Sequence, residues 1–148
     1  TGIKTAELTN ASTSQFYNPI KKQWASDILD KLNIPTSILP HVSQPGYILG
    51  TLKSEIQKTL NLNETKVTLI ATHDTASAVA AIPNTKQTIS AFISSGTWSL
   101  VGIQTDTPII NNQSLKFGFT NEIGFNGNIR FLKNVTGMWL IQQCLETW

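Results

Sequence analysis

The strongest constraint on the fold is a segment near the middle of the chain that predicts a strand, a turn and a helix in succession. Residues 67–71 are β-branched or apolar, residues 76–81 are mostly small helix formers, and Pro83 ends the pattern. In open α/β sheets, ligands bind beyond the carboxyl ends of the strands. The polar turn at residues 72–75 therefore lies where an α/β protein would place its chemistry.

The composition is that of a soluble globular protein. Of the 148 residues, 40% are hydrophobic, and no apolar run approaches the roughly 18 residues of a membrane-spanning helix. A net charge of +2, scattered along the chain, argues against nucleic acid as a partner. Small molecules or protein are the expected partners, with no membrane. The single cysteine, Cys144, cannot form an internal disulfide, so we expect a reducing, cytoplasmic location.

Two further segments before the central one predict helices. The pair Asn18-Pro19 is a typical helix start, and apolar residues then recur every four positions. These residues predict one amphipathic helix: Ile20, Trp24, Ile28 and Leu32. After an irregular connection rich in Pro and Gly, residues 52–60 predict a second, shorter helix.

After Pro83 the composition becomes rich in β-forming residues. Residues 88–93 and 98–103 predict the two strands of a hairpin around a turn at residues 94–97. A third strand is expected near residues 129–132, and a last helix from near Val135. We therefore expect a domain boundary near Pro83, which divides the chain into residues 1–83 and 84–148.

Asp74 is the candidate general base of the central turn. Its carboxylate can accept a proton from an attacking hydroxyl that lies within hydrogen-bond reach. An Asp at this place is equally favoured as a helix N-cap, and the two roles are compatible. The adjacent His73 is either structural or in contact with a substrate. A hydrolase triad is disfavoured because neighbouring side chains diverge and no Gly-x-Ser-x-Gly string occurs.

The expected hairpin turn is a candidate phosphate site. Turn amides and the hydroxyls of Ser95 and Thr97 can donate to phosphate oxygens, and Gly96 adds no bulk beside them. A polar turn with Gly96 chosen for its backbone freedom explains the same residues without a ligand. No Gly-Lys-Ser or Gly-Lys-Thr string occurs, so a Walker loop is excluded.

The last expected helix carries one polar residue among apolar ones. An apolar stripe at helical spacing is formed by Val135, Met138, Trp139, Leu145 and Trp148. Gln142 falls within this stripe, where it would either bond the backbone at the edge of the core or contact a ligand. Asn134, just before the helix, fits a plain N-cap. No His or Cys has metal-ligand spacing with another, so no metal site is expected in the chain.

Four strings along the chain resemble the sugar kinases of the FGGY family and, within it, the rhamnulokinases. The strings are LTNASTSQ at residues 8–15, HDTASAVA at 73–80, ISSGTWSL at 93–100, and LKN with GMWLIQ between 132 and 142. The resemblance covers nearly the whole chain and keeps the order of the strings. It implies an α/β, actin-like (ribonuclease H-like) fold in two lobes. Residues 1–83 would end the sugar-binding lobe, and residues 84–148 would begin the ATP-binding lobe.

The resemblance also implies roles for individual residues. Asp74 matches the catalytic base, which also contacts the substrate. The other matches to substrate-binding positions are His73, Thr75 and Asn134. The matches to ATP-contacting positions are Thr97 and Gln142, with Ser95 and Gly96 beside Thr97 in the expected phosphate cradle. ATP and Mg²⁺ are the implied cofactors. The family more often has Gly in place of Ile123, which leaves Asn121 and Glu122 without an assigned role.

The activity implied is ATP-dependent phosphorylation of L-rhamnulose to L-rhamnulose 1-phosphate in rhamnose catabolism. Within the family, the alternative is another ketose such as fuculose or xylulose; outside it, a non-catalytic sugar-sensing or interaction module. Thr1 is no initiator methionine and Trp148 has no helix cap after it, so we expect a piece of a larger chain. The remainder of the kinase would then be a partner, and the isolated piece nearly inactive.

Overall fold

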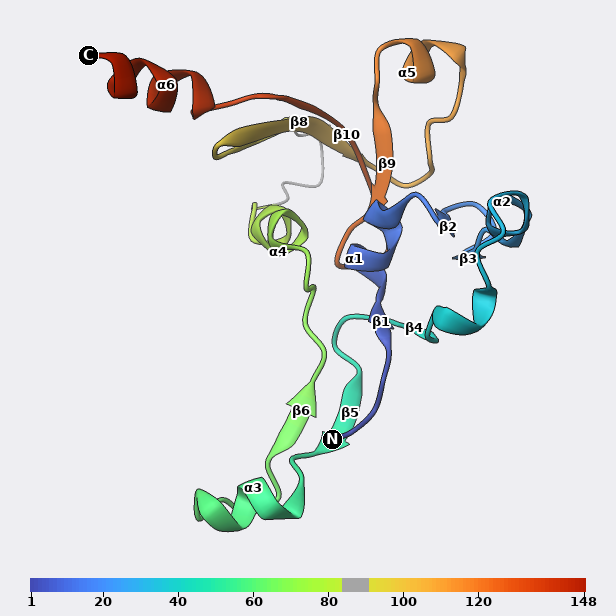
Figure 1. Cartoon of the computed structure of the whole chain (residues 1–148), viewed down its shortest axis with the longest axis vertical. Coiled ribbons are helices and arrows are strands. Elements are labelled where there is room, and N and C mark those ends of the chain that lie inside the picture. The colour runs from blue at the N-terminus through green and yellow to red at the C-terminus, as the bar shows by residue number, and fades with distance from the viewer. Residues whose placement is uncertain (84–90) are drawn as a thin grey trace. The chain divides into compact units, whose positions relative to one another are not determined.

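The computed structural model describes residues 1–83 and 91–148, and these residues combine helices and strands throughout (Figure 1). They divide into two compact units, Thr1–His73 and Asp74–Trp148. The mixed α/β character expected from the sequence is confirmed. Residues 88–90 of the expected first hairpin strand lie outside the described residues.

Short strands in pairs organise the first unit. Within residues 1–73, β1 (Ala6–Glu7) pairs in parallel with β4 (Val42–Ser43), while β2 (Tyr17–Asn18) with β3 (Gln23–Trp24), and β5 (Ile48–Thr51) with β6 (Lys66–Thr68), are antiparallel. The helices are α1 (Leu8–Ala11), η1 (Ser12–Ser14), α2 (Ser26–Lys31), η2 (Thr36–Ile38) and α3 (Ser54–Thr59). The helix expected at residues 52–60 is confirmed as α3. The strand expected at 67–71 is present but ends earlier, at Thr68.

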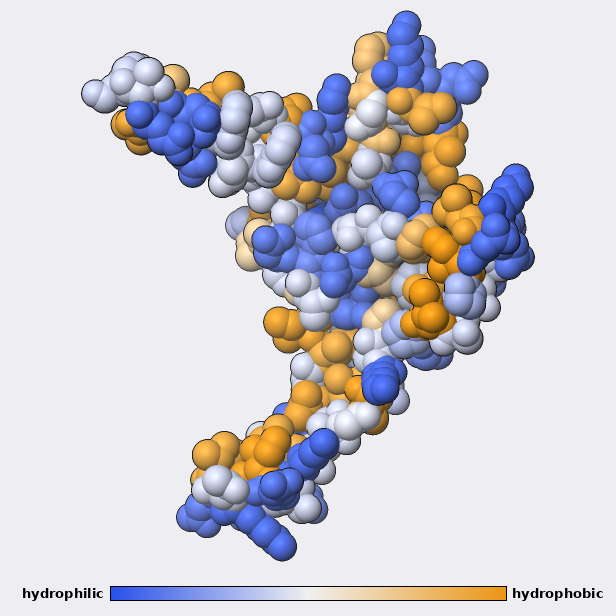
Figure 2. Space-filling view, in the orientation of Figure 1, coloured by the Kyte–Doolittle hydropathy of each residue, from blue (hydrophilic) through white to orange (hydrophobic). Residues whose placement is uncertain are grey.

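The core of the first unit gathers around α1 and α2. Its buried apolar residues include Leu8, Ala11, Tyr17, Ala25 and Leu29. Apolar side chains also reach the surface over α3 and the strands β5 and β6, where Figure 2 shows them in orange. Two of them, Ile56 and Leu60, are 42% and 60% exposed. The apolar residues around α1 and α2 are therefore buried, whereas those over β5, α3 and β6 lie at the surface.

The prediction of one long helix from residue 19 to 32 is wrong. The Asn18 Oδ1 atom accepts the backbone N–H groups two and three positions further on, at 3.0 and 2.9 Å, and Lys22 adopts a φ of 52°. The chain turns back on itself, so Trp24 pairs with Tyr17, and its indole N–H donates to the carbonyl of Pro40 at 2.9 Å. Asn-Pro here begins a turn, a role that Asn also favours. Helix α2 is the part of the pattern that remains.

A single antiparallel sheet with a helix against it forms the second unit. Its described strands are β7 (Ala91–Ser95), β8 (Trp98–Thr105), β9 (Thr120–Ile123) and β10 (Ile129–Thr136), in the order β7-β8-β10-β9. The helices are α4 (Asp74–Ala80), α5 (Asn112–Lys116) and α6 (Trp139–Thr147). Helix α4 packs on the sheet where Val79, Phe92 and Leu132 form a buried cluster.

The second unit confirms the hairpin and corrects the start of the last helix. Strands β7 and β8 pair antiparallel, with Ser95 opposite Ser99 at the turn. Strand β10 continues to Thr136, so α6 begins at Trp139 instead of near Val135. Asn134 lies opposite Leu100 within the sheet and is not a helix N-cap.

Helix α6 is more exposed than its apolar stripe predicts. Met138 and Trp139 are each 45% exposed and Leu145 is 65% exposed, so this stripe is at most partly covered. Gln142 is exposed as well, so it is not a buried polar group at the edge of a core. The backbone, in contrast, ties the start of α6 firmly to the hairpin turn.

The turn between β7 and β8 caps the start of α6 with its carbonyl groups. The Gly96 carbonyl accepts the N–H of Met138 at 2.8 Å, and the Thr97 carbonyl accepts the N–H groups of Gly137 and Trp139, each at 3.2 Å. A helix leaves its first N–H groups without partners inside the helix. The turn therefore satisfies groups that would otherwise remain open at this end of α6.

Gly137 is the glycine that this docking requires. A Cβ atom there would lie 2.6 Å from Ser99 Oγ and 2.8 Å from the carbonyl carbon of Trp98, and closer still to the Gly96 carbonyl oxygen. A Cβ atom on Gly96 would meet its nearest neighbour, the Trp98 oxygen, at 3.4 Å, and Gly96 has no positive φ. The expected need for backbone freedom at Gly96 is therefore wrong, and the tight position is at residue 137.

We expect Gly137→Ala to destabilise the second unit by about 1–3 kcal/mol, the usual cost of forcing an extra carbon into a packed site. The turn would have to move away and lose its hydrogen bonds to α6. Urea unfolding of this chain, followed by tryptophan fluorescence, measures the change. Gly96→Ala is the matched control and should leave the midpoint nearly unchanged. Equal midpoints for Gly137→Ala and the parent would contradict the docking.

Candidate active site

The first candidate string lies after β6 and opens α4. Asp74 is exposed and is the first residue of α4, and its Oδ1 atom accepts the backbone N–H of Thr75 at 2.6 Å. The hydroxyl of Thr75 also donates to this oxygen, at 3.3 Å. Thr75 itself is buried, whereas His73 is half-buried. The carboxylate of Asp74 is thus oriented by the first turn of the helix and accessible from solvent.

A buried carboxylate that the sequence did not reveal supports this string. Glu7 is 5% exposed, and its Oε2 atom accepts both the backbone N–H and the hydroxyl of Thr72, each at 2.9 Å. The hydroxyl of Thr9 donates to the same oxygen at 2.5 Å and accepts the backbone N–H of His73 at 3.3 Å. The bonded segments are 65 residues apart, so no local pattern signals the contact.

The second candidate string is the β7–β8 turn. The side chains of Ser95 and Thr97 are exposed, and Ser95 Oγ lies 3.3 Å from Ser99 Oγ. The Gly96 N–H donates to the Trp98 carbonyl at 2.9 Å, so this amide serves the turn itself. Hydroxyl groups, rather than a full set of turn amides, are therefore what the turn offers to a ligand.

The remaining candidates lie on the same unit. Asn134 is exposed near the end of β10, and Gln142 is exposed on α6, where its own N–H donates to the Met138 carbonyl at 3.0 Å. The second unit thus carries Asp74, Thr75, Ser95, Gly96, Thr97, Asn134 and Gln142, whereas His73 ends the first unit.

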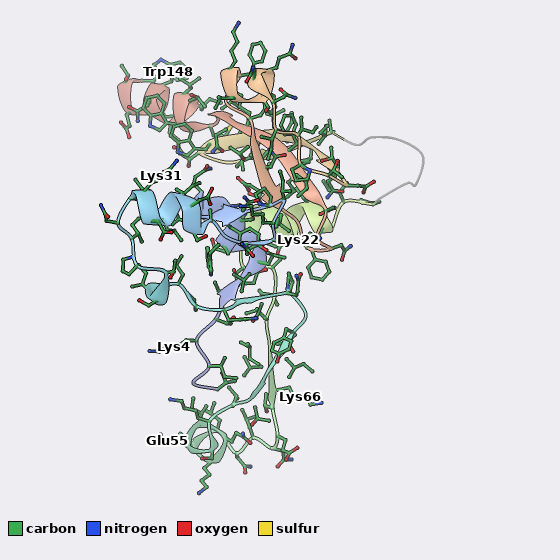
Figure 3. The ribbon with its side chains drawn as sticks, turned by 90° about the vertical axis from the view of Figure 1, so that its right-hand side faces the viewer. Lys4, Lys22, Lys31, Glu55, Lys66 and Trp148 are labelled. Atoms are coloured by element: carbon green, nitrogen blue, oxygen red, sulfur yellow. The ribbon has the colours of Figure 1, made fainter. Side chains whose placement is uncertain are left out.

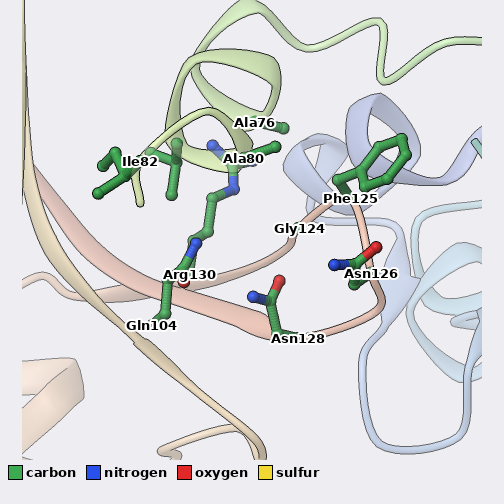
Figure 4. A pocket seen from close by; sticks show the side chains of 10 residues that line it. Ala76, Ala80, Ile82, Gln104, Gly124, Phe125, Asn126, Asn128 and Arg130 are labelled. Atoms are coloured by element: carbon green, nitrogen blue, oxygen red, sulfur yellow. The ribbon is translucent and has the colours of Figure 1, made fainter. Parts of the chain in front are cut away.

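A small cavity of about 80 Å³ lies beneath α4, between Ala76, Ala80 and the turn at residues 124–128 (Figure 4). Figure 4 shows Arg130 extending from its strand toward α4. Arg130 is fully buried, and its Nη2 atom donates to Glu122 Oε2 at 3.0 Å. Of the described residues lining the cavity, none is a candidate site residue. Arg130 and Glu122 thus form a buried charged pair within the second unit.

The structure gives Asn121 and Glu122 structural partners. Asn121 accepts the backbone N–H of Ile109 at 2.7 Å and donates to its carbonyl at 3.0 Å, and Glu122 pairs with Arg130. Ile123, the departure from the family pattern, is a buried residue of β9 opposite Ile129. An extended strand suits a β-branched side chain, so the departure is accommodated locally.

The described residues bring no group of three His, Cys, Asp or Glu side chains close enough together to hold a metal ion. None of the helices in the described ranges is long and apolar enough to cross a membrane.

Comparison with known proteins shows which family the chain resembles. The model of the FGGY family of carbohydrate kinases, N-terminal domain, matches residues 1–81. Rhamnulokinase from Oceanobacillus iheyensis is 42% identical over 97% of this chain and 30% of its own length. Rhamnulokinase from Enterococcus faecalis is 45% identical over 97% of this chain and 29% of its own length. The chain thus spans about 30% of the curated relatives that it matches.

Solved structures share the fold. Gluconate kinase from Lactobacillus acidophilus matches with a TM-score of 0.75 and 22% identity, over 97% of this chain and 28% of that protein. Ligand-bound xylulose kinase from the same organism matches with a TM-score of 0.70 and 21% identity, over 89% and 26%. At these identities the likeness shows the fold alone. Because the family model matches more than half of its residues, the chain belongs to the FGGY family of carbohydrate kinases.

Proposed function

We propose that the chain is a segment of an ATP-dependent kinase that converts L-rhamnulose to L-rhamnulose 1-phosphate. The observation that carries this proposal is the identity of 42% and 45% with two rhamnulokinases over 97% of the chain. Residues 1–83 would complete the sugar-binding lobe, and residues 84–148 would begin the ATP-binding lobe. The remainder of the kinase chain supplies the other parts of the site, in the cytoplasm.

Asp74 is the general base in this proposal. The 1-hydroxyl of the sugar gives its proton to the Asp74 carboxylate as its oxygen bonds to the γ-phosphorus of ATP, and the bond to the bridging oxygen breaks to release ADP. The exposed position of Asp74 at the start of α4 supports this role. Thr75, whose N–H and hydroxyl both donate to Asp74 Oδ1, would orient the base. His73 and Asn134 would contact the sugar.

The nucleotide would meet the β7–β8 turn and α6. The N–H groups of Gly137, Met138 and Trp139 are bonded to the turn carbonyls, so at this turn phosphate oxygens would meet the exposed hydroxyls of Thr97 and Ser95. Gln142, exposed on α6, offers an amide. These donors fit part of a nucleotide but include no carboxylate for Mg²⁺. When bound, MgATP supplies the phosphoryl group and neutralises its charge.

One prediction tests the reaction and its base in the full-length kinase that carries this chain. ADP release is measured with L-rhamnulose, L-fuculose and D-xylulose, and we expect the highest kcat/KM with L-rhamnulose. Asp74→Asn should lower kcat by at least about a hundredfold, with the sugar KM little changed, because a general base is lost. Asp106→Asn, which removes an exposed carboxylate elsewhere, is the control. A turnover of Asp74→Asn close to the parent's would contradict the assignment.

Another prediction concerns the turn between β7 and β8. Thr97→Val removes the hydroxyl but keeps the shape of the side chain and the carbonyl that binds α6. We expect the KM for ATP to rise by about tenfold to a hundredfold, as for loss of a hydrogen bond to a charged group. The KM for the sugar should stay at the parental value. Thr107→Val serves as the control on an exposed threonine of the same unit, and an unchanged ATP KM in Thr97→Val would remove Thr97 from the nucleotide site.

A further inference from the structure

We propose that Glu7 is a positioning residue for the phosphoryl-transfer site. Its buried carboxylate holds the backbone of Thr72 directly and that of His73 through Thr9, and so fixes the chain that leads into Asp74. This inference rests on the proposed function, because it concerns the placement of the base and of a sugar contact. The inference adds Glu7 to the residues on which that function depends, although Glu7 is remote in the sequence from the base and from the sugar contact.

The contacts of Glu7 reach in two directions. Toward its own helix, Oε1 accepts the N–H of Thr9 at 2.9 Å and Oε2 accepts the N–H of Asn10 at 3.2 Å, which caps α1. Toward the candidate site, Oε2 accepts the N–H and the hydroxyl of Thr72. One carboxylate therefore joins the start of α1 to the segment between β6 and Asp74.

Helix capping alone does not explain a glutamate here. Capping needs only an oxygen that accepts N–H groups two or three positions on, which Ser, Thr, Asp and Asn provide with shorter side chains. Helix α1 has four residues, so the cap stabilises little structure. The extra length of Glu7 is used in the bonds to Thr72.

The hydroxyl of Thr9 extends the influence of Glu7 by one residue. It donates its hydrogen to Glu7 Oε2, so a lone pair of its oxygen remains to accept the N–H of His73. The orientation of this hydroxyl depends on the carboxylate. Two successive backbone N–H groups, those of Thr72 and His73, are thus held by Glu7 in one connected network.

The network requires a charged carboxylate. Burial alone would raise the pKa of Glu7, but the hydrogen bonds from Thr9 and Thr72 outweigh it, so the pKa lies below the ordinary value of 4.5. Each of the hydrogen bonds described above has Glu7 as the acceptor, so a Gln at this position would turn its NH₂ group toward an N–H or O–H group in either orientation. Glu7→Gln keeps the volume, but it replaces a charged acceptor by a neutral one and sets an NH₂ group against at least one N–H donor, so it weakens the network.

Small displacements matter at a site of this kind. A general base must lie within hydrogen-bond reach of the proton that it takes, and a misplacement of about 1 Å can lower the rate about a hundredfold. Freed Thr72 and His73 backbones would shift the sugar contact and the base. The candidate nucleotide-binding residues on the β7–β8 turn are held by other hydrogen bonds, so the loss of the Glu7 bonds should not move them.

The test compares kcat and both KM values among variants of the full-length kinase, with kcat corrected for the folded fraction from thermal melts. Glu7→Gln should lower kcat by at least about tenfold and raise the KM for L-rhamnulose, with the ATP KM within about twofold of the parent. Thr72→Val removes one donor and leaves the cap intact, so it should show the same pattern more weakly. Thr72→Ser keeps the hydroxyl and should restore parental values.

Glu55→Gln is the matched control, because Glu55 lies on the surface of α3 in the same unit (Figure 3). Parental kcat and sugar KM in Glu7→Gln and Thr72→Val, in an active parent, would overturn this inference and leave the proposed function standing. Proportional loss toward sugar and ATP would also overturn it, since that pattern marks a role in folding only. If Glu7→Gln does not fold, Thr72→Val and Thr72→Ser decide. A parent inactive on every ketose would overturn both proposals.

Discussion

The hydrogen bonds of Glu7 are the interaction on which the candidate active site depends most. Strand β6 ends at Thr68, and the sheet-like bonds of this segment end with Leu69, which exchanges bonds with Tyr47 and Gly46. Beyond this point Glu7 and Thr9 bind the backbone N–H groups of Thr72 and His73. Just before Asp74, the backbone is thus held by hydrogen bonds to side chains instead of by pairing between strands. A carboxylate suits this place because it accepts several donors at once.

A second constraint ties together the candidate nucleotide residues. The carbonyls of Gly96 and Thr97 bind the N–H groups at the start of α6, and Gly137 leaves room for this approach. The turn that carries Thr97 and the helix that carries Gln142 are therefore joined through the backbone. Their side chains remain exposed, so they are available to a ligand. Backbone hydrogen bonds thus join the two elements, and in the proposed function their side chains contact the nucleotide.

Local patterns predicted the parts of the fold that local interactions determine. The strand, turn and helix around Asp74, helix α3 and the β7–β8 hairpin follow from propensity and turn chemistry. The helix expected from residue 19 failed because a spacing of four also fits a hairpin followed by a short helix, and Trp24 pairs across the strands. Asn134 was misplaced because its pairing with Leu100 extends β10. Glu7 gave no signal, since its partners at Thr72 lie 65 residues away.

The most direct test of this account is amide hydrogen exchange at Thr72 and His73 in the parent and in Glu7→Gln. If the carboxylate holds this backbone, both amides are protected in the parent and exchange at least about tenfold faster in the variant. The amides of the β8–β10 ladder in the second unit should keep their parental rates in both proteins. A Thr72 amide that exchanges in the parent as fast as an open amide, or at the same protected rate in both proteins, would contradict the central role of Glu7.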